Sequence, residues 1–320
     1  MFFEGSEKKA EILVDASKLN LLTDINDQFW SEFVECCHAK ILSSISNAHC
    51  KAFLLSESSL FVWQDRLLIL TCGETQLVNS VTHFIEQKGT DAIVHFIYQR
   101  KNEYFAQAQP SCFGDDIKLL SQYLPGKAYR FGEMDSHHNY VFHLDNDFKA
   151  ETEDKTYELL AYQISDLASK KLTEPNLSTL EIRNYLAIDT LLPGFDIDDF
   201  VFEPYGYSLN AIKGEQYLTI HVTPQADSSY ISFESNLNLI RLAPTILAIL
   251  SPRSFDLMSF NEHDFEALLA DHIDSSYISK SLVNEQLSNG YEVSFANFIR
   301  PQTQFSKPVE LDISGDNYAL

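Results

Sequence analysis

The stretch LSESSLFV, residues 55–62, sets polar side chains between two apolar runs that are typical of β-strands. An ordinary hairpin carries Gly, Asn or Asp at its turn. Here the turn carries Glu57, Ser58 and Ser59, a carboxylate followed by two hydroxyls. Turn geometry alone does not explain this choice of residues.

Other chemistry-bearing side chains are less informative. Cys36, Cys37, His38, His49 and Cys50 lie near one another in the sequence. Adjacent residues of a helix point about 100° apart, and this spacing fits no common zinc site. We therefore interpret the adjacent cysteines as an ordinary buried thiol pair and predict no metal. His137 and His138 are expected to lie in a turn that enters a strand. The sequence also lacks GxGxxG, P-loop, HExxH, GxSxG and CxxC motifs.

Strands and helices alternate around these residues. Apolar periodicity predicts helices over 26–37, 74–89 and 239–250. Strands are expected over 52–57, 59–63, 67–72, 91–100 and 229–235, with a hairpin over 205–224 that turns at 213–214.

An internal echo links SEKKAEILVD (6–15) to EDKTYELLAY (153–162). Each has acidic residues, a lysine and an aliphatic pair in register, which indicates a duplicated half. The predicted fold is α+β: antiparallel sheets sandwiched together, with helices on the outer faces (αββα). No linker is recognisable, so one domain over 1–320 is expected.

Composition narrows the function. The formal net charge of −23 argues against nucleic acid or an anionic membrane as a partner. The 320 residues include no apolar run long enough to span a bilayer, and five cysteines without a leading apolar segment indicate reduced thiols. We expect a soluble, cytoplasmic protein.

Taken together, the motifs resemble one family: the eukaryotic-type, pyruvoyl-dependent S-adenosylmethionine decarboxylases. The resemblance extends to about residue 236 and is loose beyond it. It is carried by FFEGSEK (2–8), LSESSLFV (55–62), LTCGET (70–75), FIYQRKN (96–102), YRFGEMDS (129–136), LLPG (191–194), GYSLNAI (206–212), TIHVTP (219–224) and SYISFESN (229–236).

The resemblance implies a reason for the opening stretch. In this family the serine attacks the preceding carbonyl, the peptide bond becomes an ester, and β-elimination splits the chain. Carried over, the cut falls between Glu57 and Ser58 and gives a β chain, 1–57, and an α chain, 58–320. Ser58 becomes the pyruvoyl group, which forms a Schiff base with the substrate and accepts the electrons released as CO₂ leaves.

The resemblance also implies roles for other residues. Cys72 matches the proton donor, and its place just before a helix is expected to favour the thiolate. Ser208 and His221 match the self-processing pair. Further matches are the adenine clamp, Phe3 and Phe202, and the acidic active-site residues, Glu4 and Glu7.

A second pocket follows from the same resemblance. In the animal-type enzymes an acidic pocket binds putrescine as an activator, and its matching positions here are Glu11, Asp154, Thr156, Glu158 and Glu234. Buried carboxylates repel one another unless a cation joins them. An exposed acidic strand face is the alternative. A homodimer of processed protomers is left open.

Two departures matter. The glutamate that holds the ribose hydroxyls in the family is Gln225 here, which we expect to weaken nucleoside binding by about 1–2 kcal/mol. Leu70 stands where the family usually has a basic residue, which bears on the putrescine response. The expected function is S-adenosylmethionine decarboxylation, supplying the aminopropyl donor for spermidine. The rivals are a pyruvoyl decarboxylase of another cationic amino acid and a non-catalytic regulatory paralogue.

Overall fold

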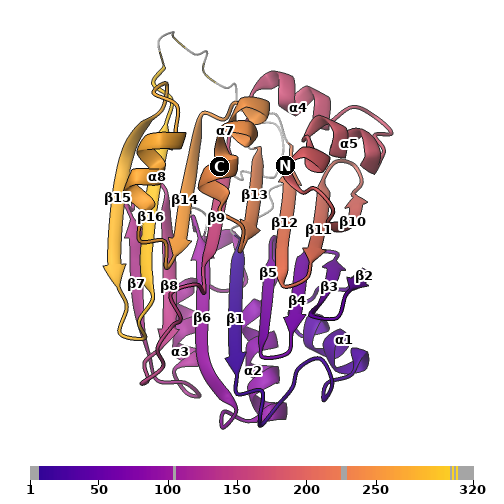
Figure 1. Cartoon of the computed structure of the whole chain (residues 1–320), viewed down its shortest axis with the longest axis vertical. Helices are drawn as coiled ribbons and strands as arrows, with labels where there is room; N and C mark the ends of the chain where they lie inside the picture. The colour runs from indigo at the N-terminus through magenta and orange to yellow at the C-terminus, as the bar shows by residue number, and fades with distance from the viewer. Residues whose placement is uncertain (1–6, 104–105, 225–228, 303–304, 306–307, 309–320) are drawn as a thin grey trace.

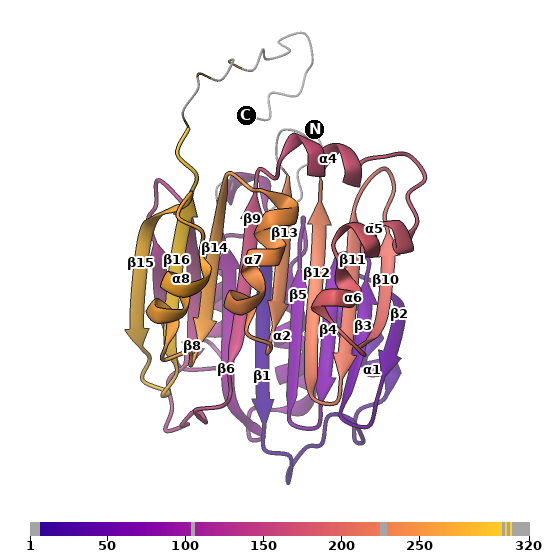
Figure 2. The ribbon, with the colours of Figure 1, turned by 45° about the horizontal axis from the view of Figure 1, so that its top comes forward.

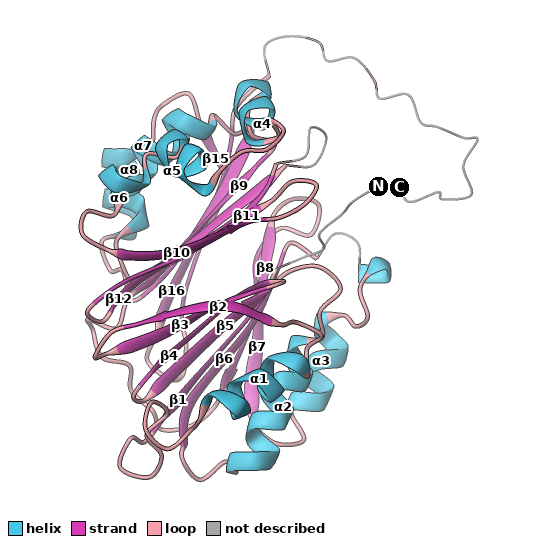
Figure 3. Cartoon of the chain, turned by 90° about the vertical axis from the view of Figure 1, so that its right-hand side faces the viewer, coloured by secondary structure: helices cyan, strands magenta, loops and turns pink. Residues whose placement is uncertain are grey.

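Two antiparallel sheets of eight strands pack face to face, and helices cover their outer faces (Figure 3). The computed structural model describes residues 7–103, 106–224, 229–302, 305 and 308. The predicted α+β sandwich is confirmed.

The first sheet comes from the N-terminal half, and α1 (Asp27–Glu35), α2 (Leu77–Lys88) and α3 (Phe113–Leu120) cover it (Figure 1). A short 3-10 helix spans Ala106–Ala108. The strands of this first sheet, in spatial order, are β2 (Ile41–Ser46), β3 (Cys50–Leu55), β4 (Ser58–Trp63), β5 (Arg66–Thr71), β1 (Lys8–Val14), β6 (Ile93–Lys101), β8 (His138–Leu144) and β7 (Gly126–Gly132).

The second sheet repeats this order with the C-terminal half. Its strands are β10 (Asp196–Val201), β11 (Tyr207–Lys213), β12 (Gln216–Thr223), β13 (Tyr230–Ser235), β9 (Thr156–Tyr162), β14 (Ser254–Phe260), β16 (Glu292–Ile299) and β15 (Ile278–Gln286). Its helices are α4 (Asp166–Leu172), α5 (Thr179–Tyr185), α6 (Ile188–Leu191), α7 (Leu239–Leu250) and α8 (Phe265–His272).

The predicted duplication is visible in the strand order. The two echo segments form β1 and β9, which occupy the same place in their sheets and lie near the middle of the sandwich (Figure 2). In the aligned echo, Glu11 of β1 corresponds to Glu158 of β9. Equivalent carboxylates thus enter the space between the sheets from both halves.

Strand alternation separates an apolar side from a polar one. In β1, Ala10 and Ile12 pack toward the helices, in a core with Trp30 and Phe33. Lys9, which precedes Ala10 and therefore points to the other face, reaches the opposite sheet and pairs with Glu158. The helix-covered faces hold the two large apolar cores, and the space between the sheets holds much of the buried polarity that positions the site.

Two predictions from composition can be compared with the structure. All five cysteines are free thiols, as expected. Among the described helices, none combines the length and the apolar character that crossing a membrane requires.

Candidate active site

The hairpin between β3 and β4 holds Ser58 in a conformation that non-glycine residues rarely adopt. Ser58 has φ of +139° and is 2% exposed. Backbone strain of this kind costs about 1–3 kcal/mol and persists only where the surroundings enforce it. The N–H of Cys72 donates to the carbonyl oxygen of Glu57 at 3.0 Å, so the carbonyl before Ser58 is held in place.

Gly73 makes room for this turn. Its φ is +64°, and a Cβ built on it would lie 3.3 Å from Oε2 of Glu57. A larger residue would be strained and would crowd the carboxylate. The LSESS and TCG motifs, separate in sequence, therefore meet because β4 and β5 are neighbours, with Ser58 opposite Thr71.

His221 faces Ser58 from the other sheet. Its Nε2 lies 2.9 Å from Ser58 Oγ, and its Nδ1 lies 2.9 Å from Ser208 Oγ. Ser208 and His221 are opposite each other in the β11–β12 hairpin, and that both lie in one hairpin was predicted from the sequence. When Nδ1–H donates to Ser208, Nε2 presents its lone pair to the Ser58 hydroxyl. The structure thus brings together three side chains, Ser58, Ser208 and His221, that the resemblance implied.

Three further polar residues surround this contact and were not predicted. Ser59 donates to Asn210 Oδ1 at 2.6 Å, and Thr219 donates to the same oxygen at 3.1 Å. The Thr219 hydroxyl also lies 2.9 Å from Nε2 of His221. A period-two pattern was available, since Asn210 follows Ser208 by two residues and Thr219 precedes His221 by two. We call Ser58, Ser208, Thr219 and His221 the serine–histidine cluster.

Burial keeps the imidazole neutral. The pKa of His221 is lowered to about 4, chiefly by desolvation, while the nearby Glu7 carboxylate opposes the shift. At pH 7 the ring therefore carries no charge and can accept a proton.

Glu7 lies at the edge of the cluster as a carboxylate. Burial is the largest influence and favours its neutral form, but Lys101, His221 and the hydrogen bonds from Lys101 and Ser232 together outweigh burial and lower the pKa of Glu7. Lys101 forms an ion pair with Glu7, and the hydroxyl of Tyr230 donates to its other oxygen at 3.1 Å. Glu7, one of the two acidic residues that the resemblance implied, thus lies close to His221 and Lys101.

Cys72 follows β5 and is 6% exposed. The expected helix effect on its thiol is not supported, because α2 begins five residues later, at Leu77, and a helix dipole acts only within about a turn. A different cation is nearby. Lys8 donates to the carbonyl of Gly73, the next residue, at 2.9 Å.

The adenine clamp is described on one side only. Phe202 follows β10; its N–H donates to the Gly206 carbonyl at 2.9 Å, and its ring lies 4.9 Å from that of Phe200. The predicted partners Phe3, Glu4 and Gln225 lie outside the described residues.

The predicted acidic pocket comes together, but cations of the chain itself lie among its carboxylates. Lys9 Nζ lies 3.0 Å from Glu158 and 2.7 Å from Glu234. Lys101 Nζ lies 3.2 and 3.5 Å from the second oxygens of the same carboxylates. All four side chains are almost fully buried.

Arg66 plays the same part at the other end of this group. Its guanidinium lies 3.0 Å from Glu11 and 2.6 Å from Asp154, which also accepts from the Tyr291 hydroxyl. Thr156 begins β9 and is buried, on the same face as Glu158. We call this group the ion-pair cluster; it consists of Lys9, Lys101, Arg66, Glu11, Asp154, Glu158 and Glu234.

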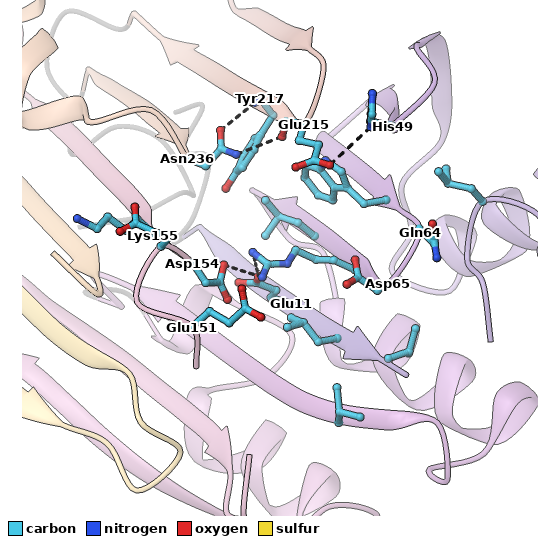
Figure 4. A pocket seen from close by; sticks show the side chains of 18 of the residues that line it. Glu11, His49, Gln64, Asp65, Glu151, Asp154, Lys155, Glu215, Tyr217 and Asn236 are labelled. Atoms are coloured by element: carbon cyan, nitrogen blue, oxygen red, sulfur yellow. Dashed lines mark hydrogen bonds and ion pairs between the residues drawn. The ribbon is translucent and has the colours of Figure 1, made fainter. Parts of the chain in front are cut away.

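The ion-pair cluster runs between two different environments. At one end Lys101 contacts Glu7, beside the serine–histidine cluster. At the other end Glu11, Arg66 and Asp154 line a cavity of about 740 Å³. Figure 4 shows Glu11 and Asp154 at this cavity, with Glu151 nearby and Glu215 joined to His49 across its rim.

Comparison with known proteins identifies similar chains. The sequence profile of a family described as adenosylmethionine decarboxylase matches residues 1–299. S-adenosylmethionine decarboxylase proenzymes from Leishmania donovani and Xenopus laevis are 32% and 30% identical, over 81% and 95% of this chain and 73% and 97% of their own lengths.

A solved structure shows the same fold. The Trypanosoma brucei AdoMetDC-delta26 monomer has a TM-score of 0.59 and 23% sequence identity, covering 76% of this chain and 99% of that one.

Proposed function

Because the chain belongs to the adenosylmethionine decarboxylase family, we propose that it decarboxylates S-adenosylmethionine in the cytoplasm with a pyruvoyl group made from its own Ser58. The product is the aminopropyl donor for spermidine synthesis. One observation carries the proposal: a strained, buried serine lies 2.9 Å from a neutral histidine, next to a carbonyl held from behind.

The residues of the chain account for maturation. Ser58 Oγ attacks the carbonyl carbon of Glu57 while Nε2 of His221 takes the hydroxyl proton. The C–N bond breaks, the proton passes to the released amine, and an ester joins the two residues. Nε2 then takes the Cα proton of Ser58, the Cα–Cβ double bond forms, and Glu57 leaves as a carboxylate. Hydrolysis of the resulting enamine, through its imine, releases ammonia and leaves the keto group.

The same residues fit the group once it is made. Ser58 lies in a buried turn between the sheets, with hydroxyl and imidazole groups of the serine–histidine cluster facing it. The pyruvoyl group supplies a carbonyl that condenses with the substrate amine and draws electrons from the breaking C–C bond. Cys72 then delivers a proton to the substrate carbon, and Phe202 contributes one face of the adenine site.

Intact-mass spectrometry tests the proposal. Purified protein is measured before and after a reagent that traps carbonyls, with Ser58→Ala as the matched control. We expect masses for residues 1–57 and 58–320, with the reagent only on the larger chain, and a single unreactive chain for the control. An uncut parent chain would overturn the catalytic proposal in favour of a regulatory paralogue.

The substrate distinguishes the proposed enzyme from the rival, a pyruvoyl decarboxylase of another cationic amino acid. Both enzymes self-cleave, so the processed protein is supplied with S-adenosylmethionine and, separately, with other cationic amino acids. Release of CO₂ from S-adenosylmethionine alone is the expected result. Preference for another amino acid would contradict it and would direct attention to Gln225.

Putrescine activation is a separate question, and the ion-pair cluster bears on it. Lys9, Lys101 and Arg66 already supply the positive charge that a diamine would bring to these carboxylates. We infer that decarboxylation proceeds without putrescine. Lys9→Leu should create a response, since it leaves two carboxylates with fewer cations. Decarboxylation activity is measured with and without putrescine. If putrescine raised the activity of the parent chain more than about fivefold, the lower end of typical allosteric coupling, the inference would be contradicted.

A further inference from the structure

Lys8 differs from the other buried lysines. Lys9 and Lys101 each form ion pairs with carboxylates, and despite burial those carboxylates raise the pKa of both ammonium groups. For Lys8, within residues 7–103, 106–224 and 229–302, no carboxylate forms such a pair. Its side chain is nevertheless 0% exposed.

Neutral oxygens hold the Lys8 ammonium instead. Nζ lies 2.8 Å from Gln109 Oε1, 2.9 Å from the Gly73 carbonyl oxygen and 3.5 Å from the Thr75 hydroxyl. A buried cation with only neutral partners is costly. Two of these partners, Gly73 and Thr75, come just after Cys72 in the chain, so the ammonium is fixed against the Cys72–Thr75 loop.

The charged and titratable groups that face Lys8 come from four segments. Burial and Arg100 of β6 lower its pKa to about 8, while Cys72, Asp116 of α3 and Glu103 oppose the shift. Asp116 is already occupied by Arg100 at 2.8 Å and by the hydroxyl of Tyr98 at 2.5 Å. Glu103 pairs with Arg100 at 2.6 Å. Among the described groups that oppose the shift, Cys72 is then the one that Arg100 does not hold.

We propose that Lys8 is the counter-ion of the Cys72 thiolate and so a positioning residue for proton delivery. This inference rests on the proposed function, in which Cys72 gives up its proton. When the S–H proton passes to the substrate carbon, the sulfur keeps the electron pair and becomes negative. The ammonium of Lys8 then faces an anion in place of a neutral thiol, and the product side of the transfer is stabilised.

Burial alone would have the opposite effect on this thiol. For the buried thiols of Cys37 and Cys50, desolvation is the largest influence and raises the pKa, to about 12 for Cys50. Tyr230, on β13, is also close to Cys72, and its own pKa is raised by burial, by Glu7 and by Cys72. A neutral tyrosine supplies no positive charge, so Lys8 is the group that separates Cys72 from the other buried thiols.

The test measures the thiol and not decarboxylation. In a Ser58→Ala background, which cannot self-cleave, the rate of iodoacetamide alkylation at Cys72 is followed against pH by peptide mass spectrometry, with Cys112 as an internal reference. Lys8→Gln keeps a donor for the Gly73 carbonyl but removes the charge, and Lys8→Arg keeps both. We expect Lys8→Gln to slow alkylation of Cys72 about tenfold at pH 7, an upward pKa shift of about one unit, and Lys8→Arg to restore it.

Two results would overturn the proposal. One is an alkylation rate of Cys72 that depends on pH in the same way in the folded Lys8→Gln variant as in the protein that keeps Lys8. The other needs no variant at position 8: an apparent pKa for Cys72 above that of free cysteine, about 8.5, would show that no cation offsets its burial. Since neither reading depends on a pyruvoyl group, failure here is distinct from failure of the proposed function.

Discussion

Two groups of buried polar side chains share the space between the sheets. They differ in whether their contacts are hydrogen bonds between neutral groups or ion pairs between charged ones. In the serine–histidine cluster the contacts are between hydroxyls and a neutral ring, with Ser58 and Ser208 each 2.9 Å from a nitrogen of His221. In the ion-pair cluster the contacts join full charges, as between Lys9 and Glu234 at 2.7 Å.

The difference separates reactivity from structural support. A hydroxyl–imidazole contact allows a proton to move in either direction at small cost, which general base catalysis needs. A buried ion pair is stable only while both charges remain, and losing one partner leaves an uncompensated charge. We therefore expect changes in the first group to affect self-processing, and changes in the second to affect stability.

The largest expected effect comes from the reactive group. His221→Ala removes the base, and because general base catalysis contributes about 10²–10⁴-fold, self-cleavage should slow by that factor. Intact masses are followed over time in newly synthesised protein. Cleavage at the parent rate would contradict the assigned role.

The ion-pair cluster supplies the contrasting prediction. Glu158→Gln leaves Lys9 and Lys101 short of negative charge in a buried site, and breaking such a pair costs about 3–5 kcal/mol. The free energy of unfolding is measured in urea, in the Ser58→Ala background so that every chain is intact. Lys171→Ala, which removes an exposed pair with Glu174, is the control and should cause no measurable change. An equally small effect of Glu158→Gln would contradict the structural role.

These contrasting groups were not equally predictable from sequence. The LSESS turn, Ser208 and His221 could be located because the family resemblance identifies their motifs. The hairpin that holds Ser208 and His221 could be predicted from local sequence alone. The echo between 6–15 and 153–162 likewise predicted the duplication that sets β1 and β9 in equivalent places.

The neutralised carboxylates could not be predicted in the same way. Lys9 lies two residues before Glu11, so alternation alone puts both on one face. Its contact with Glu158, however, depends on how the two sheets pack, as does that of Lys101. Leu70 was identified as the loss of a basic residue, but the structure supplies positive charge from other strands, through Lys9 of β1 and Lys101 of β6. The helix after Cys72 was predicted, but its start at Leu77 removes the expected dipole effect.

Acid pH should sharpen the comparison, since His221 is buried in its neutral form. Its folded-state pKa of about 4 lies below the unfolded value of 6.5. Between these values the unfolded chain binds a proton that the folded chain does not, so stability falls as the pH drops from 6.5 to 4. The contribution of this ring approaches about 3 kcal/mol.

The measurement is urea unfolding across this pH range in the Ser58→Ala background. His221→Gln is the matched variant, because it removes the titrating ring and leaves every carboxylate in place. The difference in unfolding free energy between the two should change with pH between 6.5 and 4. A constant difference would mean that His221 is not held neutral by burial.

The smallest expected effect distinguishes two adjacent serines. Ser59 donates to Asn210 at 2.6 Å, lies 3.1 Å from Thr219, and is only at 3.4 Å from His221 Nε2, whereas Ser58 is at 2.9 Å from that atom. Ser59→Ala should therefore keep self-cleavage and lose the support of a hydrogen bond, about 1 kcal/mol or roughly a fivefold slower rate. Time-resolved intact mass compares it with Ser58→Ala, which should remain whole. If Ser59→Ala also remains whole, the attacking hydroxyl has been assigned to the wrong serine, because only the nucleophile is indispensable to the acyl transfer.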